Sequence, residues 1–377
     1  MRSVPAAVMD CGHPCPPERE ARTALHEREL NKRPRLSVLR TLADRMSALH
    51  HRGNANLRRK NQAMANFNRD TIDRRSFLKT ATPFAVGVCS IARGQVPVER
   101  GRFSEAEVPR AQEQLLKLVN AERLSAGLSQ LELDDLACKV ASEHALDMAR
   151  GGFLSHWGSD GRKFYHRYSF AGGTDAGQEN ASAAEYIQSL TPTAVIQDLR
   201  DMHVSMLEEK PPYDGHRKTI LDPFHTHVGF GIASQEHSLR LDELYLARYV
   251  RMDPISRRAK PKSKVVLTGN LLNPKHFLNQ VDVYYEALSK PPDRDWLRTP
   301  RPVSLPDTYK TLRPKALPGT TYPDGSRGDF DWWHDGRFRV PASLFNDQPG
   351  IYTIVFWIRR VPTDKGFPGA EVCILGE

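Results

Sequence analysis

One stretch most constrains the fold and the function of this chain: residues 153–180, FLSHWGSDGRKFYHRYSFAGGTDAGQEN. They lie between two helical patterns and combine a His-Trp pair, a Ser-Asp-Gly turn, aromatic and basic residues, and a Gly-Gln-Glu-Asn run. A long polar, aromatic-rich loop is poor core material, and such loops in compact domains usually carry function. Residues 214–233 have a similar character. We therefore expect His156, Glu179 and His216 to meet in one cleft.

The positive charge of the chain is unevenly distributed. Of 377 residues with a formal net charge of +9, residues 1–100 hold 19 Lys and Arg against 9 Asp and Glu. The rest of the chain holds 35 against 36 and is nearly neutral. A nucleic-acid-binding domain needs a basic surface on its folded part, so nucleic acid is excluded as a partner.

The excess charge lies in a predicted leader. Residues 73–79, DRRSFLK, resemble a twin-arginine export signal, and a short, weakly apolar stretch follows. Small residues at Ser90 and Ala92 suit cleavage after Ala92. We predict a signal peptide at 64–92, export to the periplasm, cell surface or exterior, and no transmembrane span in the mature chain. Residues 1–63 are polar and Arg-rich, which indicates a disordered extension or a start-site artefact.

Helical and strand patterns alternate in residues 93–252. Apolar residues at helical spacing, bounded by Pro, Asp and Gly, predict three helices. These helices are expected at 109–127, 134–150 and 193–209, and strands at 178–184, 228–233 and 244–250. Helices alternating with a few strands predict an α/β domain with α-β-α layers.

Beyond residue 252 the pattern changes to strands. Residues 253–264 contain Pro254, Pro261 and several basic residues and are predicted to be an exposed linker. Runs of β-branched and aromatic residues predict an all-β, sandwich-like domain at 265–377. Its strands are expected at 265–271, 281–288, 337–340 and 351–358, and a Pro-rich excursion at 294–328. Residues 351–358 are apolar on both faces, as in a central strand.

Residues 109–250 resemble the CAP superfamily, which comprises cysteine-rich secretory proteins, antigen 5 and pathogenesis-related 1 proteins. The resemblance rests on motifs in a fairly specific order and spacing. They are Leu118-Val119-Asn120 with Arg123 and Gly127, the helix at 137–149, Ser155-His156, Asp160-Gly161, Glu179-Asn180, Gly215-His216-Arg217 with Ile220-Leu221, and the Val-Gly-Phe-Gly run at 228–231.

The resemblance implies an α-β-α sandwich whose cleft is lined by two histidines and two glutamates. His156, Glu179 and His216 match three of these positions. The second glutamate lies late in the third helix in the family, and we take Glu209, with Glu208 as the alternative. The choice stays open because a longer EEKPPYD run precedes the Gly-His motif here.

Two imidazoles are suited to a divalent metal such as zinc, so His156 and His216 are the predicted metal ligands. A zinc-bound water beside a glutamate base would make a hydrolase site. Catalytic zinc usually has three protein ligands, however, and two histidines are one short. The alternative is a His–Glu hydrogen-bonded network that rigidifies the cleft.

Other candidate residues favour structural roles. His225 and His227 are interpreted as surface histidines rather than a metal pair, and His144 as a packing residue in its helix. Cys138 is expected to be buried. Only Cys138 and Cys373 would remain after cleavage, so no disulfide framework is expected. Four aromatic residues of the long loop either line a groove or anchor the loop: Trp157, Phe164, Tyr165 and Tyr168.

We therefore expect an exported protein that binds a small apolar, lipid or glycan ligand, or an envelope partner, without catalysis. The alternative is a metal-dependent hydrolase, such as a peptidase, that uses the same cleft.

Overall fold

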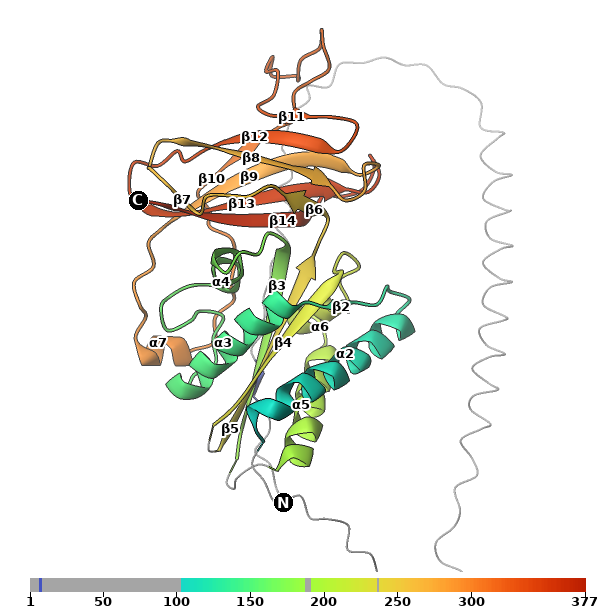
Figure 1. Ribbon diagram of the computed structural model, residues 1–377, viewed down its shortest axis with the longest axis vertical. Coiled ribbons are helices and arrows are strands. Elements are labelled where there is room, and N and C mark those ends of the chain that lie inside the picture. The colour runs from blue at the N-terminus through green and yellow to red at the C-terminus, as the bar shows by residue number, and fades with distance from the viewer. Residues whose placement is uncertain (1–6, 9–102, 187–190, 236) are drawn as a thin grey trace, which may run out of the picture. The chain divides into compact units, whose positions relative to one another are not determined.

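A computed structural model describes residues 7–8, 103–186, 191–235 and 237–377 (Figure 1). The predicted signal peptide and nearly all of residues 1–63 lie outside the described residues. The described residues from 103 onwards belong to one compact unit, together with strand β1. Within the described part, no helix is both long and apolar enough to cross a bilayer.

The first part of this unit is a mixed helix and sheet domain. Its sheet has the order β1-β3-β5-β4-β2, with β2 parallel to β4 and the other pairs antiparallel. The strands are β1 (Ala7–Val8), β2 (Glu132–Leu133), β3 (Ala176–Glu185), β4 (His227–Gln235) and β5 (Ser238–Ala247). The helices are η1 (Glu105–Glu107), α2 (Val108–Ser125), α3 (Asp135–Gly151), α4 (Phe164–Phe170), α5 (Pro192–Leu207) and α6 (Gly215–Ile220).

Local sequence signals set the ends of α3. The Asp134 side chain accepts a hydrogen bond from the Ala137 amide at 2.7 Å, so it caps the start of the helix. Gly152 ends the helix at φ 61°, a left-handed conformation that favours glycine. The predicted boundaries of this helix are therefore correct to within a residue.

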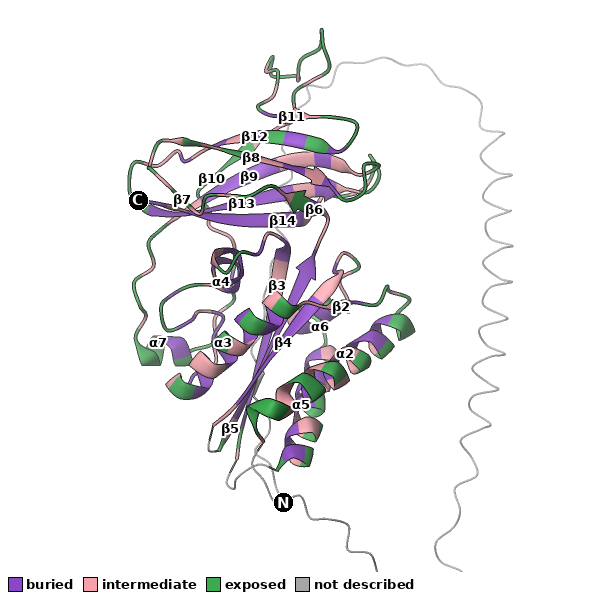
Figure 2. Ribbon diagram, in the orientation of Figure 1, coloured by how far each residue is buried: buried purple, intermediate pink, exposed green. Residues whose placement is uncertain are grey.

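The two faces of the sheet are covered by different helices (Figure 1). α3 lies against β4, where Gly229 and Gly231 let the backbones approach closely. On the opposite face, apolar residues of α2 and α5 pack with Phe230 and Tyr245. These covered sheet faces hold the buried residues that fill the domain interior (Figure 2).

The C-terminal part is all-β except for the short helix α7 (Arg294–Arg298). Its two sheets have the orders β10-β9-β13-β14-β7 and β11-β12-β8-β6, and one apolar core contains residues from both. The strands of the first are β7 (Arg258–Ala259), β9 (Phe277–Ala287), β10 (Tyr309–Leu312), β13 (Gly350–Arg359) and β14 (Phe367–Gly376). Those of the second are β6 (Val250–Met252), β8 (Lys264–Leu271), β11 (Asp331–Trp332) and β12 (Arg337–Ser343). β13 is the middle strand of its sheet, which confirms the central strand predicted at 351–358.

The two parts share a core. Phe164, Tyr165 and Tyr168 of the α4 helix pack in one cluster with Ile351 and Cys373 of the C-terminal sheet. The predicted linker at 253–264 takes part in this junction. It contains β7, which pairs with β14, and the Arg257 guanidinium donates to Ser169 Oγ at 2.9 Å and to the Gly173 carbonyl at 2.8 Å.

Several elements differ from the sequence prediction. α4 lies in a stretch expected to be a loop, and β14 was not predicted. β5 begins at Ser238, six residues before the expected strand at 244–250. The expectation of surface histidines was wrong for His225, which is 5 % exposed, because it packs against Tyr245 under the sheet. Cys138 and Cys373 are both buried and free, and burial was the prediction for Cys138.

Candidate functional site

The first histidine of the predicted cleft is held by a buried hydrogen bond to a glutamate. His156 and Glu179 are 0 % and 2 % exposed, and His156 Nδ1 lies 2.8 Å from Glu179 Oε1. Arg167 of α4 donates to the other oxygen of Glu179 and, at 3.0 Å, to the His156 carbonyl. The loop after α3, strand β3 and helix α4 therefore meet at one carboxylate.

The second histidine has a similar arrangement. His216 Nδ1 lies 2.5 Å from Glu209 Oε1, and the His216 amide donates to Glu209 Oε2 at 3.0 Å. Glu209 is half-buried, whereas Glu208 is exposed. Of the two glutamates that the sequence offered, the structure therefore places Glu209 on the histidine.

Neighbouring residues of β3 connect the two pairs. Glu179 binds His156, and the next residue, Asn180, donates to the His216 carbonyl through Nδ2 at 3.3 Å. Each histidine uses Nδ1 for its glutamate, which is the orientation that metal-binding histidines usually receive from a carboxylate. His216 Nε2 is buried without a hydrogen-bond partner among the described residues. The histidine–glutamate pairs are thus compatible with the predicted metal ligands, and His216 is the better fitted of the two.

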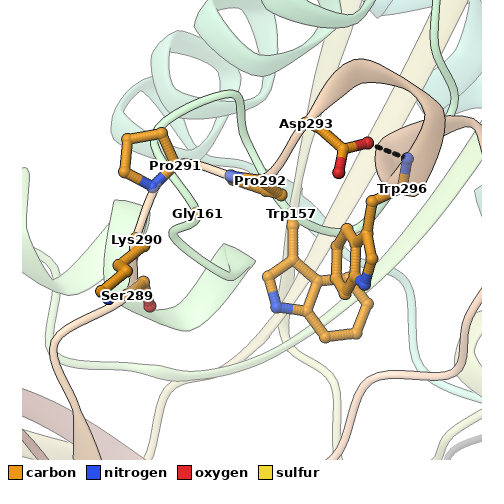
Figure 3. A pocket seen from close by; sticks show the side chains of 8 residues that line it. All are labelled: Trp157, Gly161, Ser289, Lys290, Pro291, Pro292, Asp293 and Trp296. Carbon is orange, nitrogen blue, oxygen red and sulfur yellow. Dashed lines mark hydrogen bonds between the residues drawn. The ribbon is translucent and has the colours of Figure 1, made fainter.

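Most aromatic residues of the long loop are packing residues. Phe164, Tyr165 and Tyr168 are 2–4 % exposed in the core shared with the C-terminal sheet. Trp157 is only half-buried and lines a hollow of about 420 Å³ with Trp296 and the 289–293 segment. Figure 3 shows the two indoles next to each other at one side of this hollow. Their ring centroids are 5.3 Å apart and their planes are nearly perpendicular.

Sequence reasoning missed two residues around Glu179. Asp242 of β5 is 1 % exposed, and His144 of α3 is also fully buried. Their side chains and Glu179 offer ligand atoms that all lie within 4.8 Å of one another. Among the described residues, His144, Glu179 and Asp242 are the set of three that comes close enough together to hold a metal ion. Neither His156 nor His216 belongs to this set. A pair of acidic residues inside the apolar run LRLDELYL was the available signal for Asp242.

The surroundings shift the pKa values of Asp242 and Glu179 in opposite directions. Burial raises the pKa of Asp242, and the adjacent charge of Glu179 raises it further. Burial acts in the same direction on Glu179, but the Arg167 charge, together with the charge of His144 and the hydrogen bond to His156, lowers the pKa of Glu179 to about 2. Burial also lowers the pKa of His144 to about 4. Near neutral pH, Glu179 is therefore ionised and His144 is neutral.

A second buried network was also missed. His203 of α5 lies between Glu243 of β5 and Glu122 of α2, with both carboxylate oxygens 2.7 Å from its ring nitrogens. Tyr245 donates to Glu243 at 3.0 Å. Burial lowers the pKa of His203, but the two glutamates outweigh this effect and raise it to about 10.

The fold agrees with comparisons to known proteins. Residues 116–247 match the model of the family described as CAP: Cysteine-rich secretory protein family. The chain therefore contains a CAP domain, joined to a C-terminal all-β region.

Individual relatives each match about a third to two fifths of this chain. An uncharacterized protein of Bacillus subtilis (strain 168), YkwD, is 28 % identical over 121 residues, which are 32 % of this chain and 41 % of that protein. This chain thus matches less than half of the length of that relative. Two solved structures are similar in part: an extracellular protein containing an SCP domain from Bacillus anthracis and an outer surface protein from Borrelia burgdorferi. The first is 21 % identical with a TM-score of 0.31, covering 40 % of this chain and 45 % of the other. The second is 15 % identical with a TM-score of 0.31, covering 39 % and 98 %.

Proposed function

We propose that this chain is an exported protein that binds a glycan without catalysis, in the hollow that Trp157 of the CAP domain and Trp296 line together. The twin-arginine motif at 73–79 supports the export. The observation that carries the binding proposal is the position of Trp157, which directly follows His156 and lines the hollow.

The His156–Glu179 pair is suited to hold this loop rather than to catalyse a reaction. The ring of His156 is bound to Glu179, its carbonyl accepts from Arg167, and the Trp157 amide donates to Ser155 Oγ at 3.1 Å. A general base must reach a substrate proton. Glu179 is buried and already engaged by two partners, so this carboxylate serves better as a positioning group.

The lining of the hollow favours a sugar over a lipid. Its volume of about 420 Å³ is within the usual range for small-ligand sites. Indole rings offer apolar contact for the C–H faces of a sugar, and Asp293 and Lys290 provide polar groups for hydroxyls. Charged residues at the rim disfavour an acyl chain. Arg301 stacks on Trp296 with its guanidinium carbon 4.3 Å from the ring centroid, which helps to preorganise that indole.

The structure also explains why the hollow forms at this loop. Gly161 has φ +80° and lies against the backbone at 289–290, where an added Cβ would come within 2.9 Å of the Lys290 carbonyl oxygen. A glycine is therefore required at this turn. The CAP-domain loop and the segment that follows β9 build the hollow together, and neither would form it alone.

The test is a calorimetric titration of the purified full-length protein with chitotetraose, cellotetraose and a short-chain phospholipid. We expect binding of a sugar, weakened about tenfold or more by Trp157→Ala or Trp296→Ala. Trp333→Ala is the matched control, since Trp333 is an exposed tryptophan outside the hollow. Binding of the phospholipid alone, or sugar binding unchanged in both hollow variants, would refute the proposed ligand and site.

A second assay addresses the hydrolase alternative. The same protein is incubated with peptide and ester substrates in the presence of zinc, beside His156→Ala. Turnover that disappears in this variant would show that the histidine site is catalytic and that the binding proposal is wrong.

A further inference from the structure

The interior between α3 and the sheet contains polar atoms that the fold leaves unsatisfied. His144 Nδ1 and Asp242 Oδ1 are buried and have no hydrogen-bond partner among the described residues. Both residues are at most 1 % exposed. A buried polar atom without a partner destabilises the fold, so two of them beside one carboxylate call for an explanation.

The tautomer of His144 places a lone pair in this space. His144 Nε2 lies 2.8 Å from the Ser155 carbonyl oxygen. A carbonyl only accepts, so Nε2 carries the proton and Nδ1 is the acceptor. A histidine that donates one nitrogen to a backbone carbonyl and keeps the other free has the arrangement of a metal ligand with its outer-shell partner.

The acid groups of the cluster are suited to a cation that displaces a proton. Glu179 is bound to the Arg167 guanidinium. Asp242 shares a hydrogen bond with Glu179, and burial raises its pKa, so a bound cation would take the place of the Asp242 proton. Glu179 also contacts His156, but a carboxylate has about four lone-pair positions and can accept a metal in addition to hydrogen bonds.

We infer that His144, Glu179 and Asp242 form a binding site for a divalent transition-metal ion of the zinc type. One imidazole and two carboxylates are donors that zinc accepts, at about 2.0–2.2 Å. Ligand atoms around one tetrahedral zinc are therefore about 3.4 Å apart. The three groups lie within 4.8 Å of one another, so side-chain shifts of about an ångström would close the site. This site is distinct from a metal held by His156 and His216, and it does not depend on glycan binding.

The experiment titrates zinc into metal-free full-length protein by calorimetry and compares matched variants. Asp242→Asn keeps the size of the side chain and removes its charge, and His144→Gln removes the imidazole. We expect each to weaken zinc binding by about tenfold or more. His225→Gln is the control, because His225 is another buried histidine, and its Nδ1 faces the Thr219 carbonyl outside the cluster. It should bind zinc like the wild type, as should Trp157→Ala.

His216→Gln and X-ray absorption separate this site from the histidine pairs. We expect His216→Gln to bind zinc normally and the zinc edge of the wild type to show one imidazole ligand. Two imidazoles, or binding lost in His216→Gln and kept in Asp242→Asn, would place the ion at the histidine pairs and overturn the inference. Absence of zinc binding would overturn it too, leaving a proton shared by Asp242 and Glu179 as the occupant. The absorption spectrum of the wild type shows whether one or two imidazoles bind the zinc, and it does so even if a variant does not fold.

Discussion

At the residue scale, His203 has the clearest consequence for stability. Its ring is 0 % exposed and lies between Glu243, also 0 % exposed, and the half-buried Glu122. Removing one partner of a buried ion pair leaves an uncompensated charge, which costs about 3–5 kcal/mol. We therefore expect His203→Gln to lower the free energy of unfolding by that amount at pH 7, measured by urea denaturation.

The pH dependence of this loss follows from the raised pKa of His203. A histidine whose folded pKa is about 10 stabilises the protein fully below its unfolded value, near 6.5, and this contribution disappears as the pH rises towards 10. The difference in unfolding free energy between wild type and His203→Gln should therefore shrink between pH 7 and 10. His225→Gln is the control, because burial lowers the pKa of His225 to about 4 and it does not titrate in this range. A difference that stays constant up to pH 10 would show that His203 is not the charged group.

At the element scale, the packing of α3 on β4 depends on two glycines. A Cβ on Gly231 would lie 2.1 Å from the backbone carbonyl of Ala141, and helix backbone cannot yield as a flexible side chain can. Overpacking of this kind costs about 1–3 kcal/mol and sometimes more, so we expect Gly231→Ala to destabilise by about 3 kcal/mol in urea denaturation. Gly177→Ala on β3 is the matched control, since its Cβ would meet no heavy atom closer than 3.5 Å. Equal effects of the two substitutions would contradict this account of the interface.

The same elements show what the sequence can and cannot predict. Helices α2, α3 and α5 have one apolar stripe with clear caps, so periodicity located them to within two residues or so. α4 was missed because its aromatic residues are buried on nearly every side, against both the CAP domain and the C-terminal sheet. β5 was predicted too short because Asp242 and Glu243 interrupt its apolar pattern.

The candidate site shows the same limit. Sequence motifs identified His156, Glu179 and His216, and the structure joins the first two through a hydrogen bond. The partners Arg167, Asp242 and His144 reach Glu179 from three other elements, and no local pattern encodes contacts over such separations. The Trp157–Trp296 hollow was unpredictable for the same reason, because its two indoles are far apart in the chain.

At the scale of the whole molecule, α4 joins the two parts. It presents Arg167 to Glu179 in the CAP domain. Its His166 lies 2.9 Å from Glu286 of β9, and Lys163, the residue just before the helix, lies 2.8 Å from the same glutamate. The Cys373 amide of β14 donates to Ser169 Oγ at 2.7 Å. A structural change in the C-terminal sheet that moves α4 should therefore also move Arg167 and change its contact with the Glu179 carboxylate.

This junction predicts how the chain unfolds. A fragment of residues 93–252 would lose the C-terminal residues that cover Tyr165, Leu244 and Leu246, and would expose that part of its core to water. We expect the fragment to melt at a clearly lower temperature than the full-length protein, and the full-length protein to unfold in one calorimetric transition. Limited proteolysis gives an independent readout. Thermolysin should cut the full chain slowly within 253–264, because β7 and Arg257 tie this segment to the rest of the fold. Rapid cleavage there into two halves, with a fragment as stable as the whole, would show that the two parts fold independently.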